Sequence, residues 1–418
     1  MIRPVITIVL LIAIAAASNL YSPFLLKLYE ILLALPILAL TLMWVERRMC
    51  SLIQVINFNL GLVLLAVFAF SISLFYHQKH IVQQASTEQL ERLGRHIIVG
   101  YRDLDTISEL VERGGVGGIF ITRHNVYDKT LAEVRQNILR LQNIQRSAKR
   151  RQLWIAANQE GGIVTHLSPP LSELPPLSSL LSENHVDVGG VVEYGKMTGN
   201  ELSKIGVNLN LAPVVDLRNV EPMFDRFSLI AQRALSDKPA LVAEAARHYA
   251  RTLETFRIMA TLKHFPGLGR VNTDTHFFSA RLTFPLSELA NTDWLPFKAV
   301  LADTQSLMML GHVILPEIDP HYPASYSKPI ISGLIRNQWQ HDGILISDDF
   351  SMAPIYYSEA GIGGVAIKAM NAGLDLILIA YDERQYYPVM AELLIADKRG
   401  LLDAKILKQS RSRLDRMI

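Results

Sequence analysis

Ile258-Met259-Ala260-Thr261-Leu262-Lys263-His264-Phe265-Pro266-Gly267 joins a short apolar run to a segment of charged, aromatic and loop-forming residues. Seven other apolar runs alternate with segments of helical composition: His96–Val99, Gly118–Ile121, Leu153–Ala156, Val207–Leu211, Leu307–Leu310, Ile344–Ile346 and Leu374–Ile379. Continuous apolar runs are typical of parallel strands that are buried on both faces. Eight strand-helix alternations predict an α/β fold, a TIM-type (β/α)₈ barrel. A doubly wound open sheet is the alternative, which the strand count disfavours.

Polar residues follow several of these runs at the point where each predicted strand ends. They are Asn158-Gln159-Glu160-Gly161-Gly162 after the third run, Lys263-His264 after the fifth, Gly311-His312 after the sixth and Ser347-Asp348-Asp349 after the seventh. In a barrel of this type the active site forms at the C-terminal ends of the strands. We therefore expect these groups to converge on one pocket.

The loop that follows the fifth run contains Asp274-Thr275-His276, a carboxylate and an imidazole two positions apart. In an extended or turn segment, both side chains can lie on one side. A carboxylate that accepts a hydrogen bond from one imidazole nitrogen fixes the tautomer and leaves the other nitrogen for proton transfer. The pair is thus a candidate proton shuttle, although an isolated Asp-x-His pattern would more often be a turn cap beside an exposed histidine.

Five motifs occur in a fixed order along the predicted barrel: Val116-Gly117-Gly118-Ile119-Phe120, Gln159-Glu160-Gly161-Gly162, Ala212-Pro213-Val214-Val215-Asp216, Lys263–Gly267 with Asp274-Thr275-His276, and Ile346-Ser347-Asp348-Asp349-Phe350-Ser351-Met352. Together they resemble glycoside hydrolase family 3, specifically its β-N-acetylhexosaminidase branch. The resemblance covers about residues 93–380 and implies a retaining β-glycosidase. The implied substrate is a β-linked amino sugar, most simply β-N-acetylglucosamine from cell-wall fragments.

The resemblance also implies roles for individual residues. Asp348 is the implied nucleophile, and His276 is the implied general acid/base, oriented by Asp274. Such chemistry needs a carboxylate to form the glycosyl-enzyme and a proton donor for the leaving oxygen. The residues implied to bind sugar hydroxyls are Lys263, His264, Arg233 and Asn158. No cofactor and no metal are implied, because the histidines lack ligand spacing.

Three positions depart from the family pattern. Asn158 replaces an aspartate that holds a sugar hydroxyl in relatives, Ile163 replaces an arginine, and Leu268 replaces a histidine. Asparagine keeps an acceptor but loses the charge, and charge-assisted hydrogen bonds are roughly twice as strong as neutral ones. We expect altered sugar recognition rather than lost catalysis. A β-glycosidase or glycoside phosphorylase of different sugar specificity, and a catalytically silent membrane-anchored sugar-binding protein, remain alternatives.

The first 76 residues differ in composition from the rest of the chain. Half of the 418 residues are hydrophobic, and the surplus that gives a mean hydropathy of +0.22 is concentrated here. Three apolar runs, Pro4–Leu26, Ile31–Val45 and Ser51–Tyr76, predict about three transmembrane helices. A cleaved signal peptide followed by buried helices is the alternative. A polar tether over residues 77–92 would then lead to the barrel domain, residues 93–418.

Arg3 and the Arg47-Arg48 pair set the expected topology, because basic residues next to membrane spans prefer the cytoplasm. Three spans then place the catalytic domain on the periplasmic or extracellular side of the inner or plasma membrane. If the second run does not span, the domain would face the cytosol, but Lys27, Arg47 and Arg48 would then lie outside. The net charge of +2 gives no indication of nucleic-acid binding. Cys50 is the single cysteine, which excludes an internal disulfide framework.

Overall fold

The computed structural model describes residues 2–218 and 228–417 and divides the chain into two compact units, Met1–Ala85 and Ser86–Ile418. The larger unit is built around a closed barrel of eight parallel strands. In barrel order the strands are β1 (Ile97–Gly100), β12 (Leu376–Ile379), β11 (Leu345–Asp349), β9 (Leu307–Leu310), β7 (Met259–Phe265), β6 (Leu209–Asn210), β3 (Trp154–Ala157) and β2 (Gly118–Ile121). The predicted barrel is confirmed, and closure excludes the open sheet.

The barrel interior is filled by alternate side chains of these strands. Its core includes Ile98, Phe120, Ala156, Leu209, Met309, Ile346 and Leu378. The intervening residues face the surrounding helices and are also buried, so β1, β2, β3, β9 and β12 are buried at every position. This two-sided burial explains why the strands are continuously apolar in sequence.

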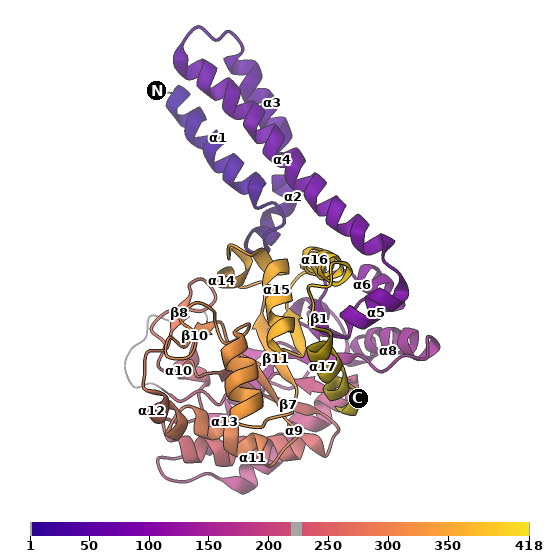
Figure 1. Ribbon diagram of the computed structural model, residues 1–418, viewed down its shortest axis with the longest axis vertical. Helices are drawn as coiled ribbons and strands as arrows, with labels where there is room; N and C mark the ends of the chain where they lie inside the picture. Colours follow the sequence, from indigo (N-terminus) through magenta and orange to yellow (C-terminus); the bar gives the residue numbers. More distant parts are fainter. Residues whose placement is uncertain (1, 219–227, 418) are drawn as a thin grey trace. The chain divides into compact units, whose positions relative to one another are not determined.

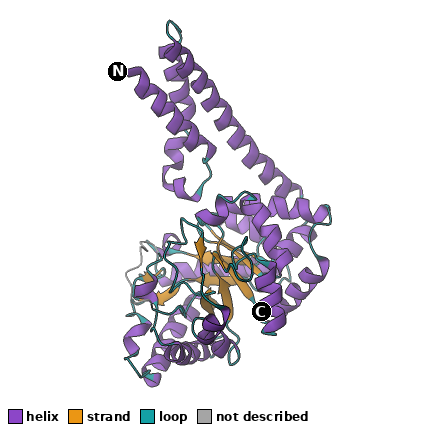
Figure 2. Cartoon of the chain, turned by 60° about the vertical axis from the view of Figure 1, so that its left-hand side comes forward, coloured by secondary structure: helices purple, strands orange, loops and turns teal. Residues whose placement is uncertain are grey.

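Helices surround the strands, which lie at the centre of this unit (Figure 2). In chain order these helices are α5 (Thr87–Gly94), α6 (Leu104–Glu112), α7 (Arg123–Val126), α8 (Leu131–Ser147), α9 (Val188–Ile205), α10 (Ile230–Arg233), α11 (Pro239–Glu254), α12 (Leu286–Asn291), α13 (Trp294–Leu301), the π-helix η3 (Pro329–Gln338), α14 (Ala353–Tyr356), α15 (Gly361–Ala372), α16 (Tyr386–Lys398) and α17 (Ala404–Met417) (Figure 1). Short 3₁₀ turns complete the unit at η2 (Leu177–Leu180) and η4 (Glu383–Gln385).

Two small sheets lie outside the barrel ladder. One is the antiparallel pair β4 (Gln159–Gly161) and β5 (Val164–Thr165), and the other joins β8 (Ala280–Arg281) to β10 (Val313–Ile314). Gly161 in the first pair has a φ of +91°, and a Cβ there would lie 1.8 Å from the Tyr194 hydroxyl. Only glycine fits this position, which turns the chain sharply after β3 and holds Glu160 in place.

Two barrel strands extend further than the apolar runs indicate. The fifth predicted strand ends at Leu262, whereas β7 continues to Phe265. The seventh ends at Ile346, whereas β11 continues to Asp349. Lys263, His264 and Asp348 therefore project from strands rather than from loops, which fixes their backbone more tightly.

The smaller unit is a helical bundle made of α1 (Ile2–Ser18), the 3₁₀ turn η1 (Pro23–Leu28), α2 (Tyr29–Leu32), α3 (Leu35–Glu46) and α4 (Leu52–Gln84). Helices α1 and α3 both pack against α4 through a shared apolar core that includes Leu10, Leu35 and Leu64. By length and composition two segments could cross a membrane, Tyr29–Glu46 and Leu52–Gln84, while the apolar part of α1 is shorter. The count of three spans thus stays a prediction.

The segment expected to be a polar tether, residues 77–92, is largely helical. Helix α4 continues to Gln84, and α5 begins at Thr87 with a capping box between Ser86 and Gln89. The boundary between the two compact units falls between these helices, at Ala85 and Ser86.

Candidate active site

The C-terminal ends of the barrel strands carry a buried ionic cluster centred on Glu160. Its carboxylate accepts two hydrogen bonds from the Arg233 guanidinium, at 2.9 Å from Nε and 2.8 Å from Nη2, and lies 2.5 Å from the Nζ atom of Lys263. Lys263 also donates to Asn158 Oδ1 at 2.8 Å. The structure thus brings together three of the predicted sugar-binding residues, and adds Glu160 as the group that holds them.

Charge pairing keeps this cluster ionised in spite of its burial. Burial alone would raise the pKa of Glu160, but Arg233 and Lys263 outweigh it and bring this pKa down to about 2. Burial lowers the pKa of Lys263, with Glu160 acting in the opposite direction. Two of the three ammonium N–H bonds of Lys263 have partners in Glu160 and Asn158, which leaves one for a ligand hydroxyl.

His264, the next residue on β7, is held by Asp216. The Nδ1 atom of His264 lies 2.7 Å from Asp216 Oδ2, and the backbone N–H of Leu268 donates to Asp216 Oδ1 at 2.7 Å. Asp216 is fully buried. One carboxylate therefore fixes both the imidazole and the loop that follows β7.

Gly269, in the same loop, lies very close to the backbone of Leu217. A Cβ on Gly269 would lie 1.9 Å from the carbonyl oxygen of Leu217. A side chain at this position would collide with the Leu217 backbone, so the close approach requires glycine.

Asp274 and His276 form the predicted pair. Asp274 Oδ1 accepts from both the backbone N–H and the Nδ1 atom of His276, each at 3.0 Å. Ser228 Oγ lies 3.3 Å from both Asp274 Oδ1 and His276 Nδ1. The His276 side chain is 38% exposed, while that of Asp274 is 8% exposed. Asp274 is thus the buried member of the pair, and His276 is the more exposed one.

The loop with His276 is tied to the turn that follows Asp348. The backbone N–H of Ala353 donates to the carbonyl oxygen of His276 at 3.0 Å. This bond couples the segment after β7 to the segment after β11. The segment that carries the candidate proton donor is therefore hydrogen-bonded to the segment that follows the candidate nucleophile.

Asp348 is half-buried near the end of β11. Burial acts to raise its pKa, but the neighbouring His264, His312 and His276, together with the backbone N–H of Asp349, lower the pKa on balance. The Asp349 N–H donates to Asp348 Oδ1 at 2.8 Å, and among the described residues no other hydrogen bond reaches this carboxylate. Asp348 is therefore an ionised carboxylate, and one of its oxygens has no hydrogen-bond partner in residues 2–218 and 228–417.

Asp349 and His312 have structural partners. Asp349 Oδ1 accepts the backbone N–H groups of Ser351 and Ala380, both at 2.9 Å, as expected for a turn cap. Burial, with a smaller contribution from Asp348, raises the pKa of Asp349 to about 6.

His312 is fully buried, with Nδ1 2.9 Å from Ser325 Oγ and Nε2 2.9 Å from the Asp349 carbonyl oxygen. Both ring nitrogens of His312 are therefore engaged within the protein.

The three family departures occupy different environments. Asn158 is part of the Glu160 cluster, where its carbonyl oxygen faces Lys263, so its amide NH₂ is left to donate. Ile163 is exposed, and Leu268 is a buried residue of the loop that Asp216 holds. Asn158 thus contacts Lys263 directly, and Ile163 lines the same pocket as Glu160 and Arg233.

His166 belongs to the same region and was not singled out from sequence. Its Nδ1 atom is buried and has no hydrogen-bond partner among the described residues. Burial, followed by the nearby Lys263 ammonium, lowers the pKa of His166 to about 4. His166 is therefore a neutral imidazole beside the Glu160 cluster. Nothing in its local sequence distinguishes it from a surface histidine.

Within residues 2–218 and 228–417, no group of three or more His, Cys, Asp or Glu side chains is arranged to hold a metal ion. The polar groups at the C-terminal end of the barrel are instead a carboxylate, an oriented imidazole and a set of hydrogen-bond donors. A barrel with this combination fits the class of hydrolases that cleave glycosidic bonds, which need a carboxylate and a proton donor.

Comparison with known proteins identifies the family. Residues 85–417 match the model of the glycosyl hydrolase family 3 N-terminal domain. The beta-hexosaminidase of Xanthomonas axonopodis pv. citri (strain 306) is 32% identical over 278 residues, which are 65% of this chain and 79% of that protein. That of Stenotrophomonas maltophilia (strain R551-3) is 31% identical over 277 residues, 65% of this chain and 78% of that protein. The chain belongs to glycosyl hydrolase family 3 and is a glycoside hydrolase.

Solved structures agree with this assignment. A family 3 beta-N-acetylglucosaminidase from Paenibacillus sp. str. FPU-7 superposes with a TM-score of 0.72 at 27% identity, covering 78% of this chain and 61% of that one. A family 3 glycosyl hydrolase from Mycobacterium smegmatis str. MC2 155 gives a TM-score of 0.69 at 26% identity, covering 78% of this chain and 96% of that one. The chain thus spans less than two thirds of the Paenibacillus protein.

Proposed function

We propose that this protein is a membrane-anchored, retaining β-N-acetylglucosaminidase that acts on cell-wall-derived or related amino sugars. The proposal rests mainly on the placement of Asp348 and His276 in segments that are hydrogen-bonded to each other. Asp348 is ionised and, among the described residues, is hydrogen-bonded by the Asp349 N–H alone, while His276 is oriented by Asp274 and its side chain is 38% exposed. The names of the beta-hexosaminidase relatives support the choice of sugar.

In the first step, the Asp348 carboxylate attacks the anomeric carbon of the sugar. The bond from that carbon to the aglycone oxygen breaks, and His276 donates its proton to this oxygen. In the second step, a water molecule transfers a proton to His276 and attacks the anomeric carbon, which releases Asp348. Two inversions give net retention of the anomeric configuration.

In this proposal the side chains around Glu160 bind the hydroxyl groups of the sugar. Lys263, Arg233 and Asn158 present donors to sugar hydroxyls, while His264 presents its second ring nitrogen. Glu160 acts by holding the two cations, since both of its carboxylate oxygens bind them. Rigid support of this kind keeps the anomeric carbon in line with Asp348.

The N-terminal bundle supports membrane anchoring. Its outer surface exposes large apolar side chains, among them Ile12, Ile37, Trp44, Leu52 and Phe70. A contiguous apolar exterior is unfavourable in water and suits a lipid environment. Arg3 lies 3.8 Å from Glu46, so the start of α1 and the end of α3 meet at the end of the bundle that also holds Arg47 and Arg48.

This arrangement is consistent with three crossings and a cytoplasmic basic end. The catalytic domain would then lie on the periplasmic or extracellular side. A reporter that is active only in the periplasm, fused at the C-terminus, tests this topology. Activity of the fusion supports it, whereas a stable but silent fusion contradicts it.

Activity is best tested on the full chain in a neutral detergent, with aryl β-N-acetylglucosaminide and aryl β-glucoside as substrates. We expect turnover of the first, with the β-anomer as the initial product by NMR. Asp348→Ala should lose on the order of 10⁴-fold or more in kcat. Added azide should restore turnover in this variant and give the α-glycosyl azide, because one inversion is then missing.

Two outcomes would contradict the proposal. Full activity of Asp348→Ala would exclude this carboxylate as nucleophile. A sugar 1-phosphate that forms only when phosphate is added would show a phosphorylase instead of a hydrolase.

A further inference from the structure

Exposed aromatic side chains in the barrel unit are confined to one end of the barrel. Among the described residues of this unit they are Tyr127, Phe277, Phe278, Tyr322, Tyr357 and Tyr381. Each lies in a connection that leaves the C-terminal end of a barrel strand, namely β2, β7, β9, β11 or β12. Aromatic rings usually contribute to cores, so exposed rings gathered at one end indicate a binding surface. This is the end that carries Asp348 and His276.

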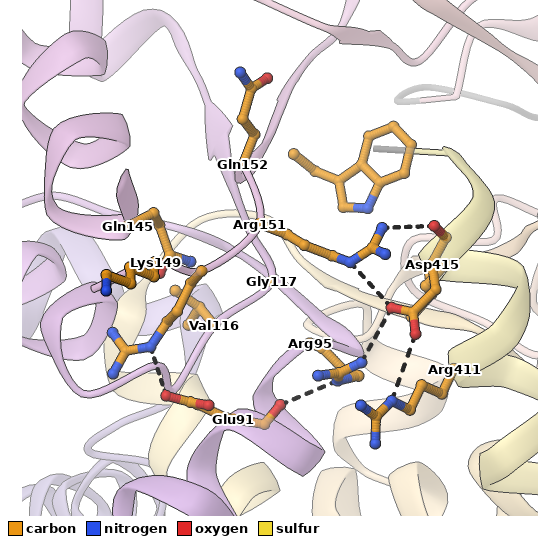
Figure 3. Close-up of a pocket in the computed structure, with 13 residues that line it drawn as sticks. Glu91, Arg95, Val116, Gly117, Gln145, Lys149, Arg151, Gln152, Arg411 and Asp415 are labelled. Atoms are coloured by element: carbon orange, nitrogen blue, oxygen red, sulfur yellow. Dashed lines mark hydrogen bonds and ion pairs between the residues drawn. The ribbon is translucent and has the colours of Figure 1, made fainter. Parts of the chain in front are cut away.

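The cavity at the other end of the barrel has a different character. Arg95 and Arg151, which come shortly before β1 and β3, line it together with Arg411 and Asp415. These side chains are joined by ion pairs, as Figure 3 shows. Among the described residues that line this cavity, Trp154 is the single aromatic one, and it is buried in the barrel core. Exposed aromatic rings are therefore a property of the catalytic end.

Two of the exposed rings are tied to the candidate proton donor. Phe277 and Phe278 follow His276 directly, and their backbone N–H groups donate to the carbonyl oxygen of Asp274 at 3.2 and 3.1 Å. The carboxylate of Asp274 orients the imidazole of His276. One residue thus fixes the proton donor and the backbone of both phenylalanines. Their ring centroids are 6.5 Å apart, and Phe278 is 62% exposed.

Tyr357 is connected to His276 through Ala353. The backbone N–H of Ala353 donates to the carbonyl oxygen of His276, and that of Tyr357 donates to the carbonyl oxygen of Ala353, each at 3.0 Å. The Tyr357 ring is exposed and packs edge-on against Tyr356, with the ring centroids 5.0 Å apart. Aromatic rings from two segments, after β7 and after β11, are thus linked to the same histidine.

Tyr381 approaches the site from β12. The N–H of the preceding residue, Ala380, donates to Asp349 Oδ1 at 2.9 Å. Burial, followed by the charges of Asp349 and Asp348, raises the pKa of Tyr381 to about 12, against the effect of Arg233. An exposed aromatic residue therefore lies within electrostatic reach of the candidate nucleophile. A lipid surface outside the site would not account for this position, whereas a saccharide that occupies the site does.

We propose that Phe277, Phe278 and Tyr357 bind the leaving part of the substrate, and that this part is a second β-linked pyranose. His276 gives its proton to the oxygen that joins the two sugars, so rings tied to His276 lie on the side of the leaving sugar. A β-linked pyranose presents axial C–H groups on its ring face, which suit the negative face of an aromatic ring. The inference rests on the proposed function and adds that the substrate is an oligosaccharide.

The test is isothermal titration of the full chain in neutral detergent, with Asp348→Asn present throughout to prevent turnover. The probes are methyl β-N-acetylglucosaminide and N,N′-diacetylchitobiose, which differ by the second sugar. We expect the disaccharide to bind about tenfold more tightly or better. Phe278→Ala should weaken binding of the disaccharide about fivefold or more and change that of the methyl glycoside less than about twofold. Phe278 is exposed, so this substitution should leave folding intact.

Two further variants complete the titration. Tyr357→Ala should have the same selective effect as Phe278→Ala. Tyr127→Ala is the matched control, because it removes a 76% exposed ring from the connection after β2, which no bond described above ties to His276. It should change the affinity for either probe by less than about twofold.

A fluorescence measurement separates a saccharide from a lipid surface. Phe278→Trp is added to the Asp348→Asn chain, and its emission is compared with that of Asp348→Asn alone. The disaccharide should shift the added emission to shorter wavelength, because it covers the indole. A shift that appears on transfer from detergent into phosphatidylcholine nanodiscs, and not with the disaccharide, would show that lipid covers this ring and would overturn the proposal.

The titration distinguishes failure of this inference from failure of the proposed function. Equal affinity for the two probes, or a disaccharide advantage that both Phe278→Ala and Tyr357→Ala leave unchanged, would overturn the inference while the proposed activity stands. Binding of neither probe up to roughly 10 mM would contradict both.

Discussion

The Nδ1 atom of His276 lies 3.0 Å from Oδ1 of Asp274, and the same oxygen accepts the backbone N–H of His276 at 3.0 Å. Two bonds to one buried oxygen fix both the position and the orientation of the imidazole. Nδ1 donates its proton to Asp274, so the proposed mechanism assigns proton transfer to Nε2. The hydroxyl of Ser228 lies 3.3 Å from both Asp274 Oδ1 and His276 Nδ1.

This geometry predicts a leaving-group effect. His276→Ala should lower kcat/KM by about 10²- to 10⁴-fold for aryl glycosides with poor leaving groups, which need a proton. Substrates with a dinitrophenyl leaving group should be affected far less. Asp274→Asn should show the same pattern in weaker form, because the imidazole is retained but its tautomer is not fixed. An equal loss on all leaving groups would contradict the role of His276.

Glu160 should be essential to stability as well as to binding. Glu160→Gln leaves Lys263 and Arg233 buried with no countercharge, which should cost about 3–5 kcal/mol of unfolding free energy near pH 7. Denaturant unfolding of the full chain in detergent measures this. Glu193→Gln, which removes an exposed carboxylate 3.3 Å from Lys196, is the control and should change stability by less than about 1 kcal/mol.

The pH dependence of the Glu160 variant follows from the direction of its pKa shift. The folded-state pKa of about 2 lies below the ordinary value, so the stabilisation is complete above the unfolded-state pKa. It is lost as pH falls from roughly 5 toward 2. The difference between wild type and Glu160→Gln should therefore shrink over this interval. A difference that stays constant with pH would show that the carboxylate charge is not the cause.

Asp349→Asn should stabilise the protein at high pH, whereas Glu160→Gln should destabilise it there. Burial raises the pKa of Asp349 to about 6, so its protonated form favours the folded state below about pH 4, and this contribution is lost as pH rises through 6. Asparagine keeps the acceptor for Ser351 and Ala380 without the charge. We compare the free energy of unfolding of the variant with that of wild type. This difference should be about 2–3 kcal/mol more favourable to the variant at pH 8 than at pH 4. Equal effects at the two pH values would contradict the assignment.

Asn158→Asp tests the departure from the family pattern. Asn158 accepts from Lys263 at 2.8 Å, and a carboxylate there could also accept from a sugar hydroxyl with its second oxygen. For an aryl β-N-acetylglucosaminide we expect kcat/KM to rise about fivefold, which corresponds to ~1 kcal/mol. The exposed Asn200→Asp is the control. A fall of similar size would show that the amide NH₂ of Asn158 is itself a needed donor, and would favour a different sugar.

The sequence was sufficient to predict the barrel, because β1, β2, β3, β9 and β12 are buried at every position and are continuously apolar. The ends of β7 and β11 could not be predicted in the same way. Lys263, His264 and Asp348 interrupt the apolar pattern, and their place on strands depends on partners far away in the chain. Lys263 is stabilised by Glu160, about a hundred residues earlier, and such pairing leaves no local signal.

The candidate site was predictable only in part for the same reason. Asp274 and His276 are two positions apart, so their contact is visible in the sequence. Glu160 was visible within its Gln-Glu-Gly-Gly motif, but its role as anchor depends on Arg233, 73 positions away. Asp216 lies 48 positions from His264, whose ring it fixes. The roles of Glu160 and Asp216 appear only once the barrel is closed.

The central claim is that Asp348 forms a covalent bond to the anomeric carbon. Its most direct test is incubation of the full chain with a 5-fluoro-N-acetylglucosaminyl fluoride, which forms a glycosyl-enzyme that hydrolyses slowly. Intact mass followed by peptide mapping should show one added sugar on the peptide that contains Asp348, and none on the Asp348→Asn variant. Attachment to any other residue, or fast turnover of natural substrate by Asp348→Asn, would contradict the account.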